Sequence, residues 1–205
     1  MKYEWRKQEK DIYGVKGTPV EKEIPVQKYI MIDGKGNPND QDFSQKVSAL
    51  YAAAYAIKME FKSRMSKPGN NEKITDYTVY PLEGIWKQTI NTLLIKEELE
   101  YTIMIRQPDF VSEAIIEAAF QNVKRKKPNP LYECIRVASM KDGHCVQILH
   151  VGSYDEEPAS FAKMQSFMKK NHWERCQNWH REIYLSNPSR SSKDSLKTIL
   201  RYMVE

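Results

Sequence analysis

The amino-acid sequence predicts an α+β protein built from two similar halves, each with a strand, a helix and two further extended segments. Segments with apolar residues at helical spacing alternate with short runs of β-branched and aromatic residues, which is typical of mixed folds. Gly34 and Phe43 lie nine residues apart at a predicted strand end and helix start, and Gly152 and Phe161 repeat this spacing. We interpret the repeat as an internal duplication, in which the halves pack together because neither can bury both faces of its sheet.

The composition is that of an ordinary globular protein. The chain has 205 residues, of which 40% are hydrophobic and 29% charged, so it can form a sizeable core without disulfides or metal. The charged N-terminus has no signal-peptide run, and no segment approaches the roughly 20 apolar residues of a membrane span. We therefore expect a cytoplasmic protein with no membrane partner. The three cysteines form no CxxC pair, and we expect no disulfide.

The first elements follow from local sequence signals. Residues 1–24 are polar, contain glycine and proline, and are too few for a helix-turn-helix domain, so we expect an irregular lead-in that packs over the domain. Residues 26–32 have the composition of a strand. Apolar residues at steps of four and three then predict a helix from Phe43 to about Ser66, with Asp42 as N-cap.

Two short extended runs, residues 76–80 and 101–106, continue the first half. The stretch between them at residues 86–95 suits either a helical turn or a continued strand, and both interpretations stay open. A second helix is predicted from Ser112, its cap, to Arg125, where a proline-rich break follows.

The second half repeats this pattern. Residues 134–140 and 145–151 are predicted to form a β-hairpin, because the Asp142-Gly143 dipeptide between them is a strong turn signal. A helix is expected at residues 158–171, since proline is favoured in a first helical turn.

The most informative segment is HREIYLS, which begins at His180. As a strand it turns its apolar residues to one face and His180, Glu182 and Tyr184 to the other, because side chains alternate. Glu182 and Tyr184 then point into whatever the open side of the sheet encloses. A solvent-facing glutamate on a half-exposed sheet is the ordinary alternative, because glutamate is rarely buried.

Four blocks of the sequence resemble stand-alone members of the GyrI-like small-molecule-binding family. Residues 180–190 (HREIYLSNPSR) are similar to the EIYLSDPRR signature of these proteins, from which Asn187 and Ser189 depart. The other blocks are IMIDGKGNP at residues 30–38, PLEGIW at 81–86 and MIRQPDF at 104–110. Together the blocks spread over most of residues 26–200.

The resemblance implies a GyrI-like domain at residues 25–205, with halves at about 25–127 and 128–205. Its fold would be two βαββ modules that share an antiparallel sheet, with helices over one face and a ligand cleft between the halves. Glu182 matches a glutamate at the cleft floor of such proteins. The expected ligand-binding residues are Trp86, Met104, Phe110, Tyr132, Glu182 and Tyr184.

What the resemblance implies about function leaves several alternatives open. Some relatives sense multidrug compounds, one inhibits DNA gyrase, and some stand-alone proteins hydrolyse cyclopropane-containing DNA-alkylating compounds. We expect binding of small lipophilic or cationic aromatic compounds, because aromatic rings and a partly desolvated carboxylate attract them. In a hydrolase, Glu182 would be the general base, and Tyr184 or Tyr132, together with Trp86, would hold the substrate. Drug sequestration, sensing and inhibition of a protein partner are the alternatives, and no cofactor is implied.

Other signals carry less weight. Glu83 is a second candidate carboxylate, but an exposed turn position is the ordinary account of it. The net charge of +5 is concentrated in runs such as residues 124–127, which suit a helix C-terminus, so no direct nucleic-acid binding is expected. His172, Cys176 and His180 have the spacing of metal ligands on one helix, but His180 lies in a predicted strand, so no metal site is expected.

Overall fold

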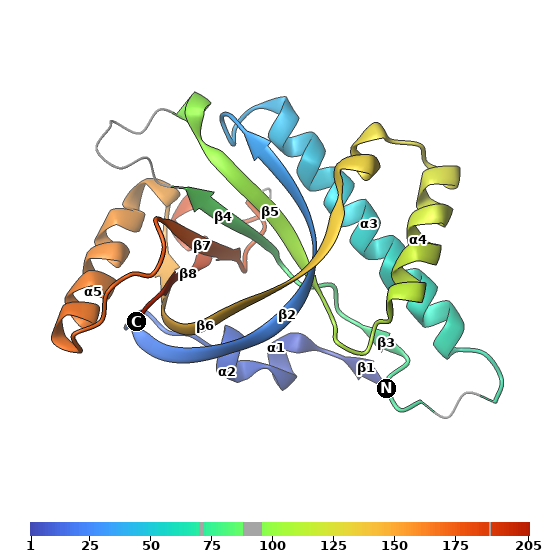
Figure 1. Ribbon diagram of the computed structural model, residues 1–205, viewed down its shortest axis with the longest axis horizontal. Coiled ribbons are helices and arrows are strands. Elements are labelled where there is room, and N and C mark those ends of the chain that lie inside the picture. The colour runs from blue at the N-terminus through green and yellow to red at the C-terminus, as the bar shows by residue number, and fades with distance from the viewer. Residues whose placement is uncertain (70–71, 88–95, 189) are drawn as a thin grey trace.

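A six-stranded antiparallel barrel forms the centre of the computed structural model, which describes residues 1–69, 72–87, 96–188 and 190–205 (Figure 1). Within this part of the chain the strands are β1 (Lys2–Tyr3), β2 (Val20–Lys35), β3 (Asp76–Tyr77), β4 (Leu82–Lys87), β5 (Glu100–Gln107), β6 (Arg136–Val151), β7 (Trp179–Tyr184) and β8 (Lys197–Met203). The helices are α1 (Trp5–Gln8), α2 (Lys10–Tyr13), α3 (Gln41–Met65), α4 (Glu113–Lys126) and α5 (Glu157–Lys170). Short 3-10 helices are η1 (Lys96–Glu98), η2 (Pro130–Cys134), η3 (Tyr154–Glu156) and η4 (Lys193–Ser195).

The barrel follows the strand order β2-β5-β4-β7-β8-β6, and β6 pairs with β2 to close it. The succession strand, helix, strand, strand occurs in residues 20–107 and again in residues 136–203, apart from the two-residue β3. The expected α+β class and antiparallel sheet are therefore confirmed. Closure of the sheet into a barrel was not expected from the sequence, because the long pairing of β2 with β6 joins strands far apart along the chain.

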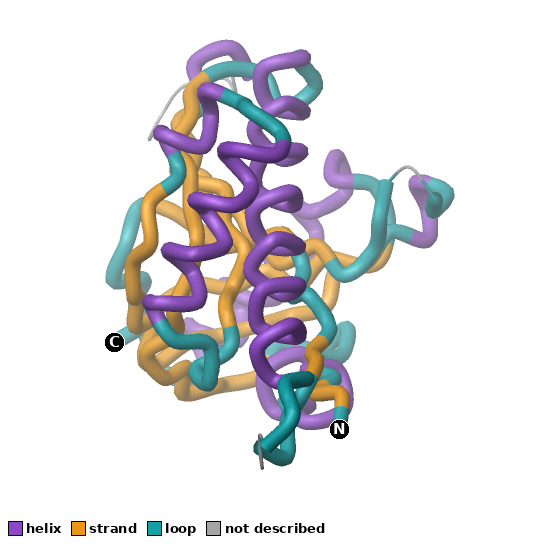
Figure 2. Tube along the Cα trace, turned by 90° about the vertical axis from the view of Figure 1, so that its right-hand side faces the viewer, coloured by secondary structure: helices purple, strands orange, loops and turns teal. Residues whose placement is uncertain are grey.

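Helices cover the outside of the barrel in two separate places. Figures 1 and 2 show α3 and α4 side by side on one part of the sheet, whereas Figure 1 shows α5 at the opposite end. Buried isoleucines of β2 and β5 belong to one apolar cluster with Leu50 and Ile57 of α3. Met164 and Met168 of α5 belong to a second cluster with residues of β6 and β8. The central strands β4 and β7 thus lie between the two helical layers.

The barrel interior combines a cluster of paired charges with a small apolar cluster. Arg181 of β7 donates to Glu83 at 3.1 Å and to Asp142 at 2.6 Å, and Arg201 of β8 donates to the other oxygen of Asp142 at 2.6 Å. Met104 lies beside them, because Arg181 also contacts its Sδ at 3.0 Å. Glu83 is 1% exposed, so the prediction that it occupies an exposed turn is wrong.

The predicted hairpin at Asp142-Gly143 is also wrong, because β6 runs through these residues as one strand. Gly143 has a φ of 64°, which only glycine adopts readily, but the chain does not reverse there. Asp142 instead turns its carboxylate into the barrel, where it binds two arginines. Tertiary charge pairing therefore overrides a local turn signal.

The lead-in forms two short helices that close one end of the barrel (Figure 1). Trp5 is buried, and its Nε1 donates to the carbonyl oxygen of Val79 at 3.1 Å. Glu9 accepts hydrogen bonds from Tyr80 and Arg106. This segment packs over the domain, but it contains the helices α1 and α2 where an irregular segment was expected, and β2 already begins at Val20.

Other elements agree with the sequence to different degrees. The helices α3, α4 and α5 and the strands β5 and β7 were predicted, whereas β4 and β8 were not. Asp42 lies in the first turn of α3, and Asp40 precedes the helix in its place. Of the open stretch 86–95, the first two residues continue β4, and residues 88–95 lie outside the described part. Among the described residues, no helix is long and apolar enough to cross a membrane.

Candidate functional site

Glu182 lies on the outer face of β7, between the two helical layers. Its neighbours in the sheet are Gly84 of β4 and Leu200 of β8. Because Arg181 points into the barrel, the alternation of a strand turns Glu182 outward. The side chain is nearly covered, since the residue is only 8% exposed.

Both carboxylate oxygens of Glu182 have partners on its own strand. Oε1 lies 2.8 Å from Nε2 of His180, and Oε2 accepts a hydrogen bond from the Tyr184 hydroxyl at 2.7 Å. These residues share one face, as the alternation in HREIYLS predicts. No Lys or Arg within the described ranges forms an ion pair with Glu182. The carboxylate is therefore held by hydrogen bonds and lacks a permanent cation.

Trp86 extends this hydrogen-bond chain to the neighbouring strand. Its Nε1 donates to the Tyr184 hydroxyl at 2.9 Å. Gly84 makes the contact possible, because a Cβ at this position would lie 2.7 Å from Trp86 Nε1 and 3.2 Å from the Tyr184 oxygen. Phe43 of α3 stacks near Trp86 with ring centroids 6.0 Å apart, and Tyr101 packs on the same indole at 5.3 Å.

The segment at the start of α5 covers the other side of the site. Phe161 packs edge-on against His180 at 4.9 Å, and Tyr154 packs edge-on against Tyr184 at 6.0 Å. Tyr154 is 39% exposed and is the most accessible of these rings. Glu157, in the first turn of α5, is 7% exposed.

The electrostatics show that Glu157 and Glu182 interact. Burial, with repulsion from Glu182 as the second cause, raises the pKa of Glu157 to about 9. Burial also raises the pKa of Tyr184 well above its ordinary value, and the charge and hydrogen bond of Glu182 add to this shift. At neutral pH, Glu157 is therefore protonated and Tyr184 remains a hydrogen-bond donor.

The structure brings Glu182, Tyr184 and Trp86 together, but it places the other predicted residues elsewhere. Met104 contacts Arg181 inside the barrel, on the opposite face of the sheet. Phe110 packs against Tyr3, Phe61 and Tyr77 in a separate group of rings. Met104 and Phe110 therefore do not lie beside Glu182 in the structure.

Tyr132 is buried in η2, which packs against α3, and the described contacts do not connect it with Glu182. The three residues with metal-ligand spacing do not share a helix: His172 follows α5, Cys176 lies in a loop and His180 stands on β7. Among the described residues, no group of three acidic, histidine or cysteine side chains is arranged to hold a metal ion.

Sequence reasoning missed the contributions of Phe43, Phe161, Tyr154, Glu157 and Gly84. A signal for two of them was present, because Phe43 and Phe161 follow their glycines at the same spacing. In the structure, Phe43 packs on Trp86 and Phe161 on His180, and these two partners face each other in the β4–β7 pair. The repeat therefore marks two rings that flank the same central strands.

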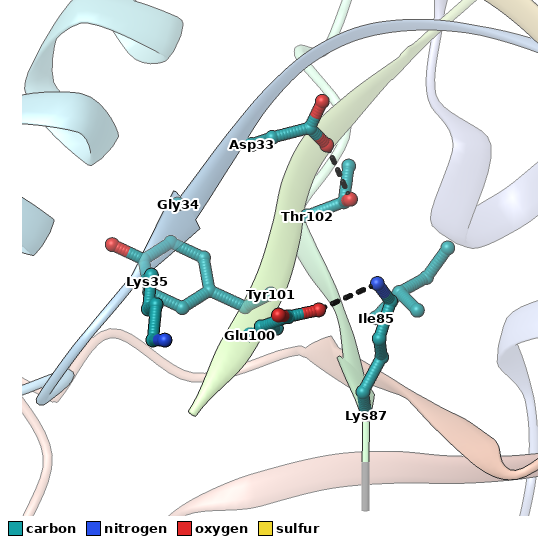
Figure 3. A pocket seen from close by; sticks show the side chains of 8 residues that line it. All are labelled: Asp33, Gly34, Lys35, Ile85, Lys87, Glu100, Tyr101 and Thr102. Atoms are coloured by element: carbon teal, nitrogen blue, oxygen red, sulfur yellow. Dashed lines mark hydrogen bonds and ion pairs between the residues drawn. The ribbon is translucent and has the colours of Figure 1, made fainter. Parts of the chain in front are cut away.

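Two hollows lined by described residues lie away from Glu182. One has a volume of about 360 Å³ and lies at the ends of β2, β4 and β5, where Lys87 pairs with Glu100 and Thr102 with Asp33 (Figure 3). The other, of about 390 Å³, is lined by residues of α5 and by the loop that contains Trp173. The expected cleft over Glu182 therefore stays a prediction.

Comparison with known proteins identifies relatives over nearly the whole chain. Residues 18–203 match the model of the GyrI-like small molecule binding domain. A solved Listeria innocua structure, described as an uncharacterized conserved protein, is 34% identical with a TM-score of 0.88, and the match covers 99% of this chain and all of that one. A second from Listeria innocua, described as a hydrolase, is 33% identical with a TM-score of 0.88 over 100% of both chains.

The C-terminal domain of EcmrR shares the fold, with 13% identity, a TM-score of 0.52 and coverage of 92% of this chain and 97% of that domain. The search of curated proteins finds no match.

Proposed function

Because the chain belongs to the GyrI-like family of small-molecule-binding domains, we propose that it binds small lipophilic or cationic aromatic compounds around Glu182. The observation that carries this proposal is a nearly buried carboxylate that has ring neighbours but no Lys or Arg ion pair in the described part of the chain. A buried carboxylate whose partners are a histidine and a tyrosine hydroxyl, without Lys or Arg, keeps part of its desolvation cost. A ligand cation would offset this cost.

The surrounding rings favour flat ligands. Trp86, Tyr184, Tyr154 and Phe161 offer polarizable surface, and the face of each ring that a cation reaches contributes roughly 1 kcal/mol. Because Glu182 is nearly covered in this structure, a ligand must displace a side chain to reach it. Tyr154 is the best candidate, since it is the most exposed ring.

Titration calorimetry with N-methylquinolinium, a permanent aromatic cation, tests the proposal. We expect saturable binding by the wild-type protein and binding weakened about tenfold or more in Glu182→Gln, which keeps the shape but removes the charge. Glu133→Gln is the matched control, because Glu133 pairs with Lys124 at an exposed surface. Equal affinity of the two variants would exclude Glu182 as the cation-binding group.

Hydrolysis of cyclopropane-containing alkylating agents is a second candidate function. It is favoured by the Listeria innocua relative described as a hydrolase and by the Tyr184 bond that orients Glu182. Glu182 would accept a proton from water as the water oxygen bonds to a cyclopropane carbon. The ring C–C bond breaks, its electron pair passes into the conjugated carbonyl to give a phenolate, and the proton returns there. Such a reaction would be a cytoplasmic detoxification.

Incubation with a cyclopropane-bearing alkylator, followed by chromatography, separates the candidate functions. Ring-opened product that depends on Glu182 would support hydrolysis. Binding without product would leave drug sequestration or sensing. Loss of gyrase supercoiling activity on addition of the protein, without small-molecule binding, would favour inhibition of a protein partner.

We also propose that the barrel arose by duplication of a βαββ module. In support, the strand order reads as two equivalent halves, with β2, β5 and β4 matching β6, β8 and β7. Phe43 and Phe161 occupy corresponding places in these halves. A polypeptide of residues 136–205 that assembles into a barrel from two copies would support this origin.

A further inference from the structure

Glu157 is a buried carboxylic acid with an unsatisfied oxygen. It stands in the first turn of α5, beside Pro158, and is 7% exposed. Its Oε1 is buried and has no hydrogen-bond partner among the described residues. A buried acceptor without a partner is unfavourable, and more so when the group carries a charge.

The groups around Glu157 are mostly acidic or neutral. The titratable groups that interact electrostatically with it are Glu182 and Tyr184 of β7, Tyr154 and Asp155 of η3, and Tyr202 of β8. His180 of β7 bonds to Glu182. Arg175 stacks on Tyr202, with its guanidinium carbon 3.9 Å from the centre of the ring. On the remaining side, Ser160 of the same helix bonds to His150 of β6.

When two buried carboxylates repel each other, one of them retains a proton at neutral pH. Glu182 has hydrogen-bond partners on both carboxylate oxygens, His180 and Tyr184. Glu157 has a bare oxygen and is repelled by the charge of Glu182, so the proton resides on Glu157. The pKa of about 9 for Glu157 agrees with this geometry.

We propose that Glu157 is a charge-selecting residue of the binding site: in the free protein the Glu157–Glu182 pair retains one proton, and a cationic ligand displaces it. The inference rests on the proposed function. A cation placed between the rings attracts both carboxylates and removes the repulsion that keeps Glu157 protonated. A neutral ligand of the same shape leaves the proton in place.

The consequence is that cation binding is coupled to proton release. The affinity for a cation rises with pH as long as Glu157 is protonated in the free protein and ionised in the complex, by up to tenfold per pH unit. This rise ends near pH 9, where Glu157 ionises without a ligand. The affinity for a neutral isostere stays constant over the same range.

Calorimetry of the wild-type protein with N-methylquinolinium and its neutral isostere 1-methylnaphthalene tests the inference. Measurements at pH 7.5 in phosphate and in Tris, whose ionisation enthalpies differ, give the number of protons released. We expect close to one proton for the cation and none for the neutral probe. Between pH 6.5 and 8.5 the cation should bind at least tenfold more tightly at the higher pH.

The variant Glu157→Gln tests whether the released proton comes from Glu157. Glu156→Gln is the matched control, because Glu156 is an exposed neighbour. The first variant should bind the cation without proton release and with little pH dependence, whereas the control should behave as wild type. Cation binding by the wild-type protein without proton release would overturn the inference and leave the proposed function standing. Failure of both probes to bind would overturn both.

Discussion

Two consecutive residues of β7, Arg181 and Glu182, are both nearly buried, but they serve opposite faces of the sheet. Arg181 points into the barrel, where it pairs with Glu83 and with Asp142, which Arg201 also binds. Glu182 points outward, where Glu157 adds a second carboxylate and the described residues supply no Lys or Arg ion pair. The ion pairs of Arg181 stabilise the fold, whereas Glu182 is the group that, under the proposed function, binds a cationic ligand.

The pKa shifts follow the same division. Burial raises the pKa of Asp142, but Arg181 and Arg201 outweigh burial and hold the pKa below its ordinary value. Burial raises the pKa of Glu157, and its acidic neighbours raise it further. For Glu83, which one arginine contacts at 3.1 Å, burial outweighs the arginines and raises the pKa. On the inner face two arginines thus keep Asp142 ionised, whereas Glu157 on the outer face has no such partner and is protonated at neutral pH.

The largest expected effect is on the inner face. Asp142→Asn removes the shared acceptor of Arg181 and Arg201, so we expect the free energy of unfolding to fall by about 3–5 kcal/mol. Glu182→Gln on the outer face should change it by less than about 1 kcal/mol, because no ion pair with Lys or Arg is lost. Urea unfolding followed by circular dichroism measures both. Similar losses in the two variants would contradict the division between the faces.

The second prediction concerns the backbone beneath the outer site. In Gly84→Ala the new methyl group would meet Trp86 Nε1 and must push the indole away. We expect a loss of about 1–3 kcal/mol in stability, as for overpacked positions, together with a shifted tryptophan emission. Gly17→Ala is the control, because its nearest atom in other parts of the chain is 3.9 Å away. An unchanged emission spectrum would show that Trp86 does not occupy this position.

The sequence predicted the outer face better than the inner one. The alternation in HREIYLS was enough to place His180, Glu182 and Tyr184 on one side of a strand, because that pattern is local. Glu83 appeared exposed because its partner Arg181 lies 98 residues later in the chain. Asp142 appeared to be a turn residue because the arginines that bind it are also remote in sequence. The helix from Pro158 could be predicted, but the approach of Glu157 to Glu182 depends on where α5 packs on the barrel.

The third prediction uses pH to compare the two faces. The pKa of Glu157 is higher in the folded state than the ordinary value for glutamate, so its contribution to stability is complete below the ordinary pKa and is lost as pH rises towards about 9. Between pH 5.5 and 8.5 this carboxyl group should lower the free energy of unfolding by about 1 kcal/mol per pH unit. Asp142 behaves in the opposite sense, because its depressed pKa contributes stability that is lost only as pH falls below the ordinary aspartate value.

Denaturant unfolding at pH 5.5, 7 and 8.5 tests this assignment in wild type and Glu157→Gln. The variant should show a flatter profile and exceed the wild-type stability at pH 8.5. Parallel profiles would mean that another group causes the pH dependence.

The smallest expected effect is at the rim of the outer site. Tyr154 packs against Tyr184 but is 39% exposed, so Tyr154→Leu should change the free energy of unfolding by no more than about 0.5 kcal/mol. Loss of one ring from the cation's surroundings should weaken N-methylquinolinium binding about threefold to tenfold, in line with one cation–π contact. Tyr55→Leu removes an exposed ring on α3 that has no aromatic partner in the described structure, and should leave the affinity unchanged. If both variants bind as wild type does, Tyr154 covers the site without contacting the ligand, and selectivity for cations must come from the two carboxylates alone.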